Sequence, residues 1–553
     1  MEKMPEITRK QDGSAFWKNT YETFEATVYV PESSLPGDIL NYGFIAPYLL
    51  VFAEKPVDFD SAAEFAKTHG LEKLAADYDS SVVFISPVQS GAVCSWENAS
   101  PDILSEIITN SKIHQYHKDG VVIANNFFRH SVDGYYIRGA IFRTVLIGFG
   151  ASADYIAKNC IRHFEGDGLW GRSDLAPATC VLTGLSVMPD VQADDIPVIS
   201  YGNSDEVNKV LKEECKYFVS GLSSASAAGD AWAAAFSSDY DSFAKQFRRM
   251  NGPLQIDPDL EKDGLVRDTG IAEVKTSKDN CGDDKGTESH KIGYFAFYNR
   301  GIFESAEAEG KAGVPLVLGF HGGGDSCFFF SVMAGWAKIA HRHDFLLVTI
   351  ENHLNSTATE MVELVEILKK KYRIDPSRIY ATGFSMGGCK TWDLVQEYPK
   401  LLAAAAPMDA TFDVGCNVYG NKVEGGINET VPVPVFYAGG EITPLPELPF
   451  QAQKCLDRMA YTLRLNKATA SARYEAEVSL DNKESWENKI WGINGDEVEQ
   501  LYDDSRDATL TMQKFKSEDG RVLSVFASIS GQGHDCREHT CEQAWLFMRQ
   551  FSR

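Results

Sequence analysis

The feature that most constrains this chain is the segment 379–388, which reads Ile-Tyr-Ala-Thr-Gly-Phe-Ser-Met-Gly-Gly. A β-rich run ends there in Gly-x-Ser-x-Gly and leads directly into a helical pattern. Such a turn is so tight that the residues two before and two after the serine must lack bulk, which Gly383 and Gly387 satisfy. Ser385 is then forced into a strained, exposed position, and strain of this kind persists where a side chain has a chemical role. The segment predicts a nucleophile elbow with Ser385 as the nucleophile.

Strand-like runs alternate with helical patterns through the C-terminal half. The apolar runs 315–320 and 345–350 are each followed by a helical pattern, over 332–342 and 358–372 respectively. The strand into the elbow continues the series. This alternation predicts an α/β fold in which a mostly parallel sheet is covered by helices on both faces.

Length and composition limit the class of protein. A chain of 553 residues with 44% hydrophobic content predicts two domains. The net charge of −25 disfavours nucleic acid and anionic membranes as partners, because phosphate-rich surfaces would be repelled. The start of the chain, 1–6, lacks the apolar core of a secretion signal, and no apolar run approaches the roughly 20 residues of a membrane-spanning helix, so we expect a cytoplasmic protein.

The cysteines point to packing. Eleven are present without a Cys-x-x-Cys pair, which favours reduced, buried thiols over a disulfide framework or a metal site. Cys536 and Cys541 flank a histidine, but their ligand-poor surroundings favour a packing role. We expect neither a metal nor a cofactor.

A polar, acidic stretch between Asn251 and His290 marks the expected domain boundary. We place a first domain at 1–255, a polar linker at 256–289 and a second domain at 290–553.

The two halves carry matching segments. Residues 143–153 align position for position with 378–388, which puts Gly150 where Ser385 stands. We interpret the match as an internal duplication whose first copy has lost its nucleophile. Ser152 lies two residues past the first turn and would point into the helix. Chance likeness between two α/β segments is the alternative.

A glycine-rich run follows the strand 315–320. It reads His-Gly-Gly-Gly, and such a run after an early strand is the expected source of one oxyanion-hole donor. We place that donor at Gly322 and Gly323. The second is the backbone N–H of Met386, at the positive end of the helix that follows the elbow.

A serine hydroxyl requires a base within hydrogen-bond reach, and the chain has 12 histidines. The base should follow the last strand. The run 522–529 is the final strand-like segment, and His534 comes directly after it, before a helix predicted over 542–551. His534 is therefore the predicted base, with His539 as a rival.

The acid that supports the imidazole should follow the strand 433–437. Glu441 is the leading candidate there, although an aspartate is the usual residue. Glu447 and the earlier Asp409 and Asp413 are its rivals.

With serine, glycine run and histidine placed, the chain from about 290 onward resembles a group of esterases that includes polyhydroxybutyrate depolymerases and feruloyl or acetylxylan esterases. The run from Asp375 through the elbow to Pro407 is similar to that group's sequence around its nucleophile. The resemblance implies an α/β-hydrolase fold, no metal or cofactor, and action on carboxylic esters. Three departures are Glu441 as the acid, a polar stretch over 451–509, and the lack of a secretion signal.

We therefore predict two α/β-hydrolase-like domains, the first degenerate and the second a serine carboxylic-ester hydrolase with an acyl-enzyme intermediate. A small or oligomeric ester is the expected substrate. A serine peptidase or amidase of the same fold is one alternative, and a non-catalytic binding or scaffold protein is another. The sequence leaves open whether the chain forms a homo-oligomer.

Overall fold

The computed structural model divides the chain into two compact units. One consists of Met1–His114 and Asn126–Leu254, and the other of Gln115–Asn125 and Gln255–Arg553. The structure describes residues 6–32, 47–77, 80–88, 95–109, 113–130, 144–162, 177–194, 196–222, 258–275, 290–323, 325–410, 412–417, 420–440, 451–469, 495–503, 508–530, 532 and 534–553.

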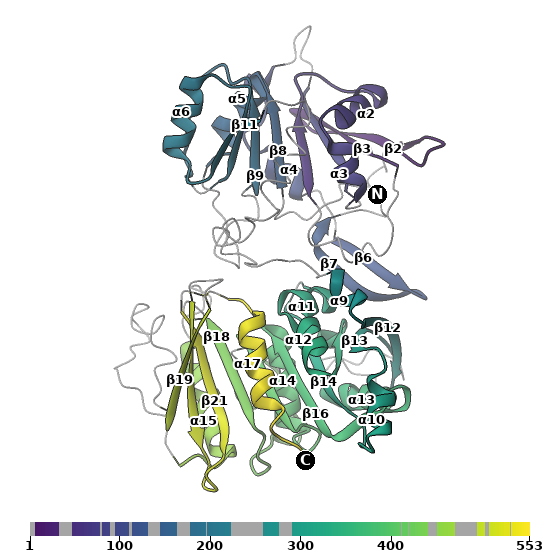
Figure 1. The fold of residues 1–553 in the computed structure, drawn as a ribbon, viewed down its shortest axis with the longest axis vertical. Coiled ribbons are helices and arrows are strands. Elements are labelled where there is room, and N and C mark those ends of the chain that lie inside the picture. The colour runs from purple at the N-terminus through teal and green to yellow at the C-terminus, as the bar shows by residue number, and fades with distance from the viewer. Residues whose placement is uncertain are drawn as a thin grey trace. The chain divides into compact units, whose positions relative to one another are not determined.

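The first unit is built on a nine-stranded sheet (Figure 1). Its strands lie in the order β1 (Thr8–Arg9), β2 (Ala15–Thr20), β3 (Phe24–Val30), β5 (Val82–Pro87), β4 (Tyr48–Phe52), β8 (Thr144–Phe149), β9 (Thr179–Thr183), β10 (Val198–Tyr201) and β11 (Phe218–Leu222). The strands from β5 to β11 run parallel, and β1, β2 and β3 add an antiparallel end.

Helices cover both faces of this first sheet. The helices α2 (Phe59–Thr68) and α3 (Leu71–Asp77) pack on one face. The other face carries α4 (Ile103–Thr109), α5 (Ala151–Asn159) and α6 (Asp205–Glu214). The unit therefore has the layered α/β architecture expected from the sequence.

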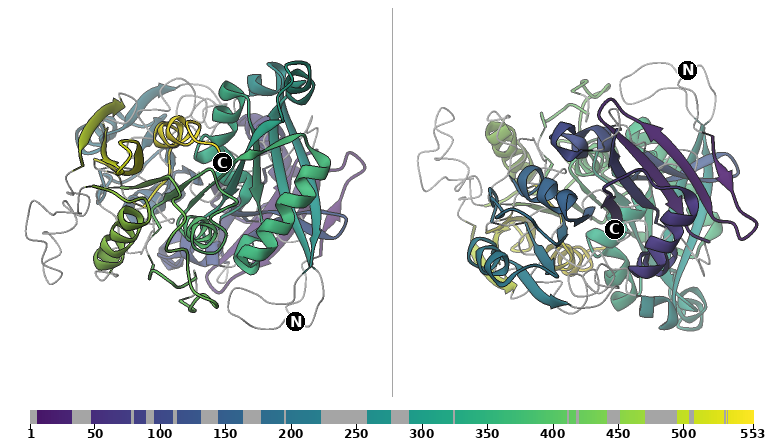
Figure 2. Two further views of the ribbon diagram at one scale, coloured as in Figure 1. Left: turned by 90° about the horizontal axis from the view of Figure 1, so that it is seen from below. Right: turned by 90° about the horizontal axis from the view of Figure 1, so that it is seen from above.

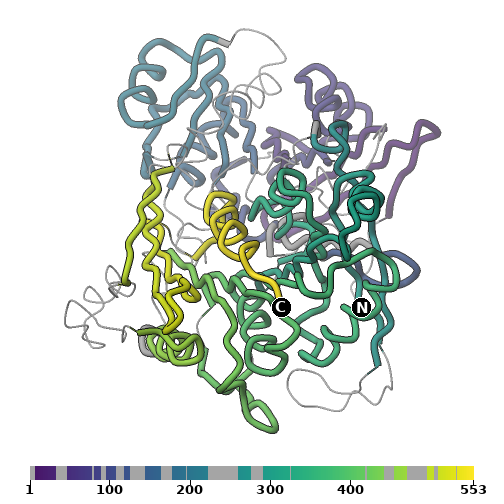
Figure 3. Tube along the Cα trace, turned by 60° about the horizontal axis from the view of Figure 1, so that its bottom comes forward, coloured from purple at the N-terminus to yellow at the C-terminus, as the bar shows by residue number. Residues whose placement is uncertain are grey.

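The second unit is built on a ten-stranded sheet. Its strands lie in the order β12 (Leu265–Val274), β13 (His290–Asn299), β15 (Leu346–Ile350), β14 (Val314–Phe320), β16 (Ile374–Phe384), β17 (Ala404–Met408), β18 (Val435–Gly440), β21 (Val522–Ile529), β20 (Ala508–Lys516) and β19 (Glu497–Asp503). The six strands from β15 to β21 run parallel. Antiparallel strands extend both ends, and the yellow β19 and β20 form one of them (Figure 3).

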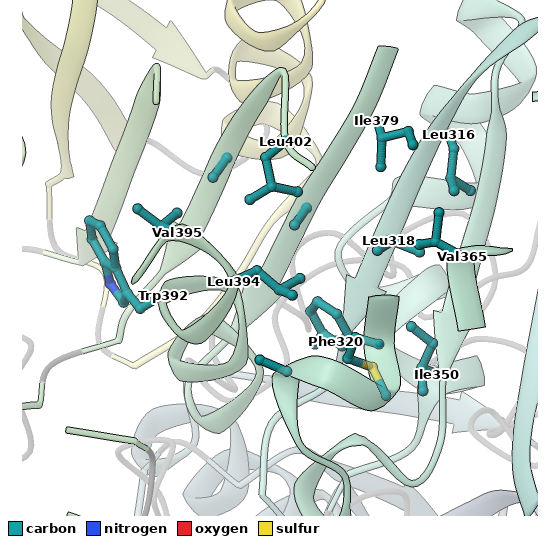
Figure 4. Close-up of a cluster of buried hydrophobic side chains, with 14 of the residues drawn as sticks. Leu316, Leu318, Phe320, Ile350, Val365, Ile379, Trp392, Leu394, Val395 and Leu402 are labelled. Carbon is teal, nitrogen blue, oxygen red and sulfur yellow. The ribbon is translucent and has the colours of Figure 1, made fainter. Parts of the chain in front are cut away.

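Helices cover both faces of the second sheet as well (Figure 2). One face carries α10 (Ile302–Ala308), α13 (Ala358–Lys371), α14 (Met386–Glu397) and α15 (Gln451–Leu465). The other carries α11 (Cys327–Met333), α12 (Trp336–His343) and α17 (Glu538–Met548). Figure 4 shows the core beneath α13 and α14, where Trp392, Leu394 and Phe320 are fully buried. Each such side chain contributes about 1.5–3 kcal/mol on burial, which fixes α14 against the strands.

Local structure departs from the sequence prediction in three places. The helix predicted over 332–342 is two helices, because Gly335 between them has a φ of 71°. The C-terminal helix begins at Glu538, ahead of the predicted start. The short helix α9 (Pro258–Lys262) and strand β12 fall within the range 256–289 that the sequence predicts as a linker. Among the described residues, no helix is long and apolar enough to cross a membrane.

A hairpin from the N-terminal half of the sequence belongs in part to the second unit. It consists of β6 (Ile113–Lys118) and β7 (Val121–His130), which pair only with each other among the described strands (Figure 1). The turn is Asp119-Gly120, with φ values of 48° and 76°. A two-residue Asp-Gly turn with positive φ at both positions matches the right-handed twist of a hairpin. This hairpin is not among the elements predicted from the sequence.

Candidate active site

Ser385 occupies the single position between β16 and α14. Its φ and ψ are 54° and −120°, a region that costs a residue other than glycine about 1–3 kcal/mol. A Cβ on Gly383 would lie 2.3 Å from the carbonyl oxygen of Gly387, and one on Gly387 would lie 2.1 Å from that of Phe320. The turn therefore requires both glycines. It leaves Ser385 partly exposed at the carboxyl end of the parallel strands.

His534 follows β21 and lies beside the serine. Its Nε2 is 2.9 Å from Ser385 Oγ, although the two residues are 149 positions apart in the chain. The ring packs against Phe384, with centroids 4.7 Å apart. Burial lowers the pKa of His534 to about 4. The imidazole is therefore neutral at pH 7 and can accept a proton from the serine hydroxyl. The rival His539 lies in the first turn of α17.

Asp409 is the described carboxylate closest to this imidazole. It follows β17 with a φ of 45°, and its Oδ2 lies 4.0 Å from His534 Nδ1. Two backbone N–H groups donate to the carboxylate, that of Asp535 to Oδ2 at 3.0 Å and that of Gly440 to Oδ1 at 3.3 Å. The His–Asp separation exceeds that of a direct hydrogen bond.

The other carboxylates considered from the sequence are placed differently. Glu441, the leading candidate, and Glu447 lie outside the described residues. Asp413 is exposed and pairs with Lys454 at 3.3 Å. From the sequence, Asp409 was only a rival candidate, because the acid was expected after β18 and not after β17. The signal that could have identified Asp409 is its place directly after the strand next to the elbow.

The glycine run lies against the elbow. A Cβ on Gly322 would come within 3.1 Å of the Phe384 ring and 3.6 Å of Ser385 Cβ. One on Gly323 would lie 2.5 Å from Met386 Sδ. These close approaches bring the run beside the first residue of α14. The N-terminus of that helix carries a partial positive charge, which suits it to stabilise an oxyanion.

The two ends of the segment 321–326, which we call the glycine loop, are fixed by buried polar contacts. The His321 ring places Nδ1 2.7 Å from the Gly322 carbonyl oxygen and Nε2 2.7 Å from the Glu351 carbonyl oxygen. The Ser326 side chain caps α11 by accepting from the N–H of Phe329. Gly324 lies outside the described residues. The loop is thus held at its beginning and at its end.

The described residues form no metal-binding group: no three or more of their His, Cys, Asp or Glu side chains are arranged to hold a metal ion. Cys536 and Cys541, which the sequence assigned to packing, are buried with their sulfurs 3.4 Å apart.

Comparison with known proteins yields partial matches. No protein-family model matches the chain. Over 129 residues, 20% of this chain and 31% of the relative, it is 27% identical to poly(3-hydroxyalkanoate) depolymerase C of Paucimonas lemoignei. Over 136 residues, 23% of this chain and 19% of the relative, it is 29% identical to the bifunctional acetylxylan esterase/xylanase of Neocallimastix patriciarum. The chain thus spans less than a third of either curated relative.

Solved structures match at low scores. The acetyl xylan esterase from Aspergillus awamori is matched with a TM-score of 0.30 and 13% identity, over 50% of this chain and 98% of that one. A thermostable esterase is matched with a TM-score of 0.28 and 15% identity, over 53% of this chain and 64% of that one.

The chain has two α/β units, each a mostly parallel sheet between helices, as the sequence predicts. Its resemblance to polyhydroxyalkanoate depolymerases and acetylxylan esterases is confirmed by the two curated relatives.

Proposed function

We propose that the second unit is a serine carboxylic-ester hydrolase with Ser385, His534 and Asp409 as its triad. The observation that carries the proposal is the 2.9 Å contact between His534 Nε2 and Ser385 Oγ. It joins a strained elbow serine to a histidine that burial keeps neutral. A nucleophile within hydrogen-bond reach of an unprotonated base is the arrangement that acyl transfer requires.

The reaction would proceed in two halves. Ser385 Oγ attacks the ester carbonyl carbon while His534 Nε2 takes the serine proton. The oxyanion forms beside the N–H of Met386 and the glycine run, where each well-placed donor is worth roughly 3 kcal/mol. His534 then gives the proton to the leaving alcohol. In the second half, His534 activates a water that attacks the acyl-enzyme and releases the acid.

Asp409 would act on the imidazole and not on the substrate. Its carboxylate faces Nδ1 of His534, so it favours the tautomer in which Nε2 is free to accept the serine proton. The same charge stabilises the imidazolium that forms during attack. Glu441 stays the alternative acid that the sequence predicts.

The names of the two curated relatives suggest which esters to examine first. We propose aliphatic hydroxyacid oligoesters and acetylated polysaccharides as the substrate classes to compare. Hydrolysis of p-nitrophenyl acetate and butyrate by the wild-type protein tests the activity itself. Cleavage of peptide p-nitroanilides with no action on these esters would contradict the proposal and favour the amidase alternative.

A further inference from the structure

The hairpin β6–β7 docks on one end of the catalytic sheet. Lys118 Nζ donates to the Thr269 carbonyl oxygen and contacts its Oγ1, both at 2.9 Å, on β12. On β13, a Cβ added to Gly293 would lie 2.4 Å from the Val122 carbonyl oxygen and 2.9 Å from Ile123 Cα. Main chain therefore packs directly on main chain at Gly293, and a side chain there would have to displace the hairpin.

The same hairpin contacts the end of the glycine loop. Cys327, the first residue of α11, donates its thiol hydrogen to the Ile123 carbonyl oxygen at 3.2 Å. Both residues are buried, with exposed fractions of 0% for Cys327 and 7% for Ile123. Burial and the nearby Glu351 raise the pKa of Cys327 well above its usual value, which keeps the thiol protonated and able to donate.

Glu351 joins these contacts to the start of the loop. Its backbone N–H donates to the Gly293 carbonyl oxygen at 3.0 Å, and its Oε2 accepts from the N–H of Cys327 at 2.9 Å. Its carbonyl oxygen lies 2.7 Å from His321 Nε2. Gly293 and Cys327, which both touch the hairpin, are thus both bonded to Glu351, whose carbonyl oxygen contacts His321.

We propose that the β6–β7 hairpin positions the glycine loop of the active site, acting through Gly293, Cys327 and Glu351. The oxyanion donors proposed at Gly322 and Gly323 lie inside the segment that these contacts bracket. A hairpin encoded in the first half of the chain then sets the geometry of a site built by the second half. The inference rests on the proposed function where it predicts kinetics, but the docking itself does not depend on it.

Three full-length variants test the proposal. Gly293→Ala forces a Cβ against the hairpin. Cys327→Ala removes the donor to Ile123, whereas Cys327→Ser retains one. Ester hydrolysis gives kcat and KM, and hydrogen–deuterium exchange of a peptide covering 321–327 reports the loop without any need for activity. Thermal unfolding identifies variants that lose the fold as a whole.

Gly293→Ala and Cys327→Ala should lower kcat about tenfold or more with KM changed less than about twofold, since small displacements of a donor cost this much. Exchange over 321–327 should rise in both. Cys327→Ser should stay near wild type in both measurements. Unchanged exchange and kcat in folded Gly293→Ala would overturn the proposal, as would an equal loss in Cys327→Ser and Cys327→Ala. If the wild type hydrolyses no ester, the function fails, and exchange alone decides the docking.

Discussion

The two units carry the same elbow with different residues in it. Gly150 has φ and ψ of 54° and −124°, and Ser385 has 54° and −120°. The N–H of Gly150 bonds the carbonyl oxygen of Thr183 at 2.8 Å, and that of Ser385 bonds Met408 at 2.9 Å. The residue after each of these partners also has positive φ, and it is Gly184 in the first unit and Asp409 in the second.

This comparison separates what the fold needs from what the chemistry needs. The strand order β2-β3-β5-β4-β8-β9-β10-β11 of the first unit matches β12-β13-β15-β14-β16-β17-β18-β21 of the second. Glycines at the nucleophile and acid positions keep the backbone path without a steric penalty. Ser152 is buried and exchanges hydrogen bonds with Phe149, so its hydroxyl serves the turn. The elbow is thus a property of the topology, and the strained side chains mark the unit expected to react.

Substitution of Ser385 has the largest expected effect on kcat, and it tests whether the two elbows differ in chemistry. Ser385→Ala should lower kcat by about 10⁶-fold, because it removes the nucleophile. Ser152→Ala should leave kcat unchanged. Labelling with a fluorophosphonate followed by peptide mapping should place the adduct on Ser385. An adduct on Ser152 would contradict the assignment of the first unit as inactive.

Replacing Asp409 tests the second difference between the units, which is the residue at the acid position. Asp409→Asn should lower kcat about 10⁴-fold, since an amide favours the wrong imidazole tautomer. Asp413→Asn is the matched control, because that carboxylate is exposed and paired with Lys454. Glu441→Gln tests the alternative acid. If Glu441→Gln is inactive while Asp409→Asn is not, the acid belongs after β18, as the sequence predicts.

The pH dependence tests the environment of the base. Burial lowers the pKa of His534 to about 4, so the imidazole stays unprotonated well below its usual range. The acid limb of kcat/KM should therefore lie near pH 4 and not near the ordinary value of about 6.5. Removing the charge of Asp409 should move it lower still, since that charge favours the imidazolium. A limb at about 6.5 in the wild type would show that His534 is not held neutral by burial.

The pH dependence of folding stability must be measured separately from the pH dependence of kcat/KM. An unfolded histidine binds its proton below about pH 6.5, whereas folded His534 does not until about pH 4. The folded state consequently loses stability as pH falls through that window. Enzyme held at each pH and then assayed at neutral pH distinguishes reversible protonation from unfolding.

Substitutions at the two elbow positions, Ser385 and Gly150, test the backbone strain. They have the smallest expected effect. Ser385→Gly should raise the free energy of unfolding by about 1 kcal/mol, because relief of a strain of about 1–3 kcal/mol outweighs the greater freedom of glycine in the unfolded chain. Gly150→Ser should lower it, since its Cβ would lie 3.0 Å from Glu54 Oε1. Gly202→Ser, at a φ of 65°, controls for the φ cost where the space is open enough for ordinary contact. Chemical denaturation measures all three, and fluorophosphonate labelling of Gly150→Ser would contradict an inactive first unit.

Local signals explain why much of the site could be predicted from the sequence. The contacts that require Gly383 and Gly387 form within a single strand–turn–helix, so the pattern itself encodes the turn. The placement of His534 needed only the rule that the base follows the last strand of the series. The matching elbow segments likewise indicated two copies of one topology.

The sequence by itself determined the α/β architecture, the two elbows and the pairing of a serine with a histidine, because each depends on periodicity and turn chemistry over about ten residues. Only the tertiary structure brought Asp409 to the imidazole and the β6–β7 hairpin to Gly293 and Cys327. Those contacts join segments far apart in the chain. The packing of the layers decides which strand end faces the imidazole and which hairpin packs on Gly293. No local sequence pattern encodes these contacts.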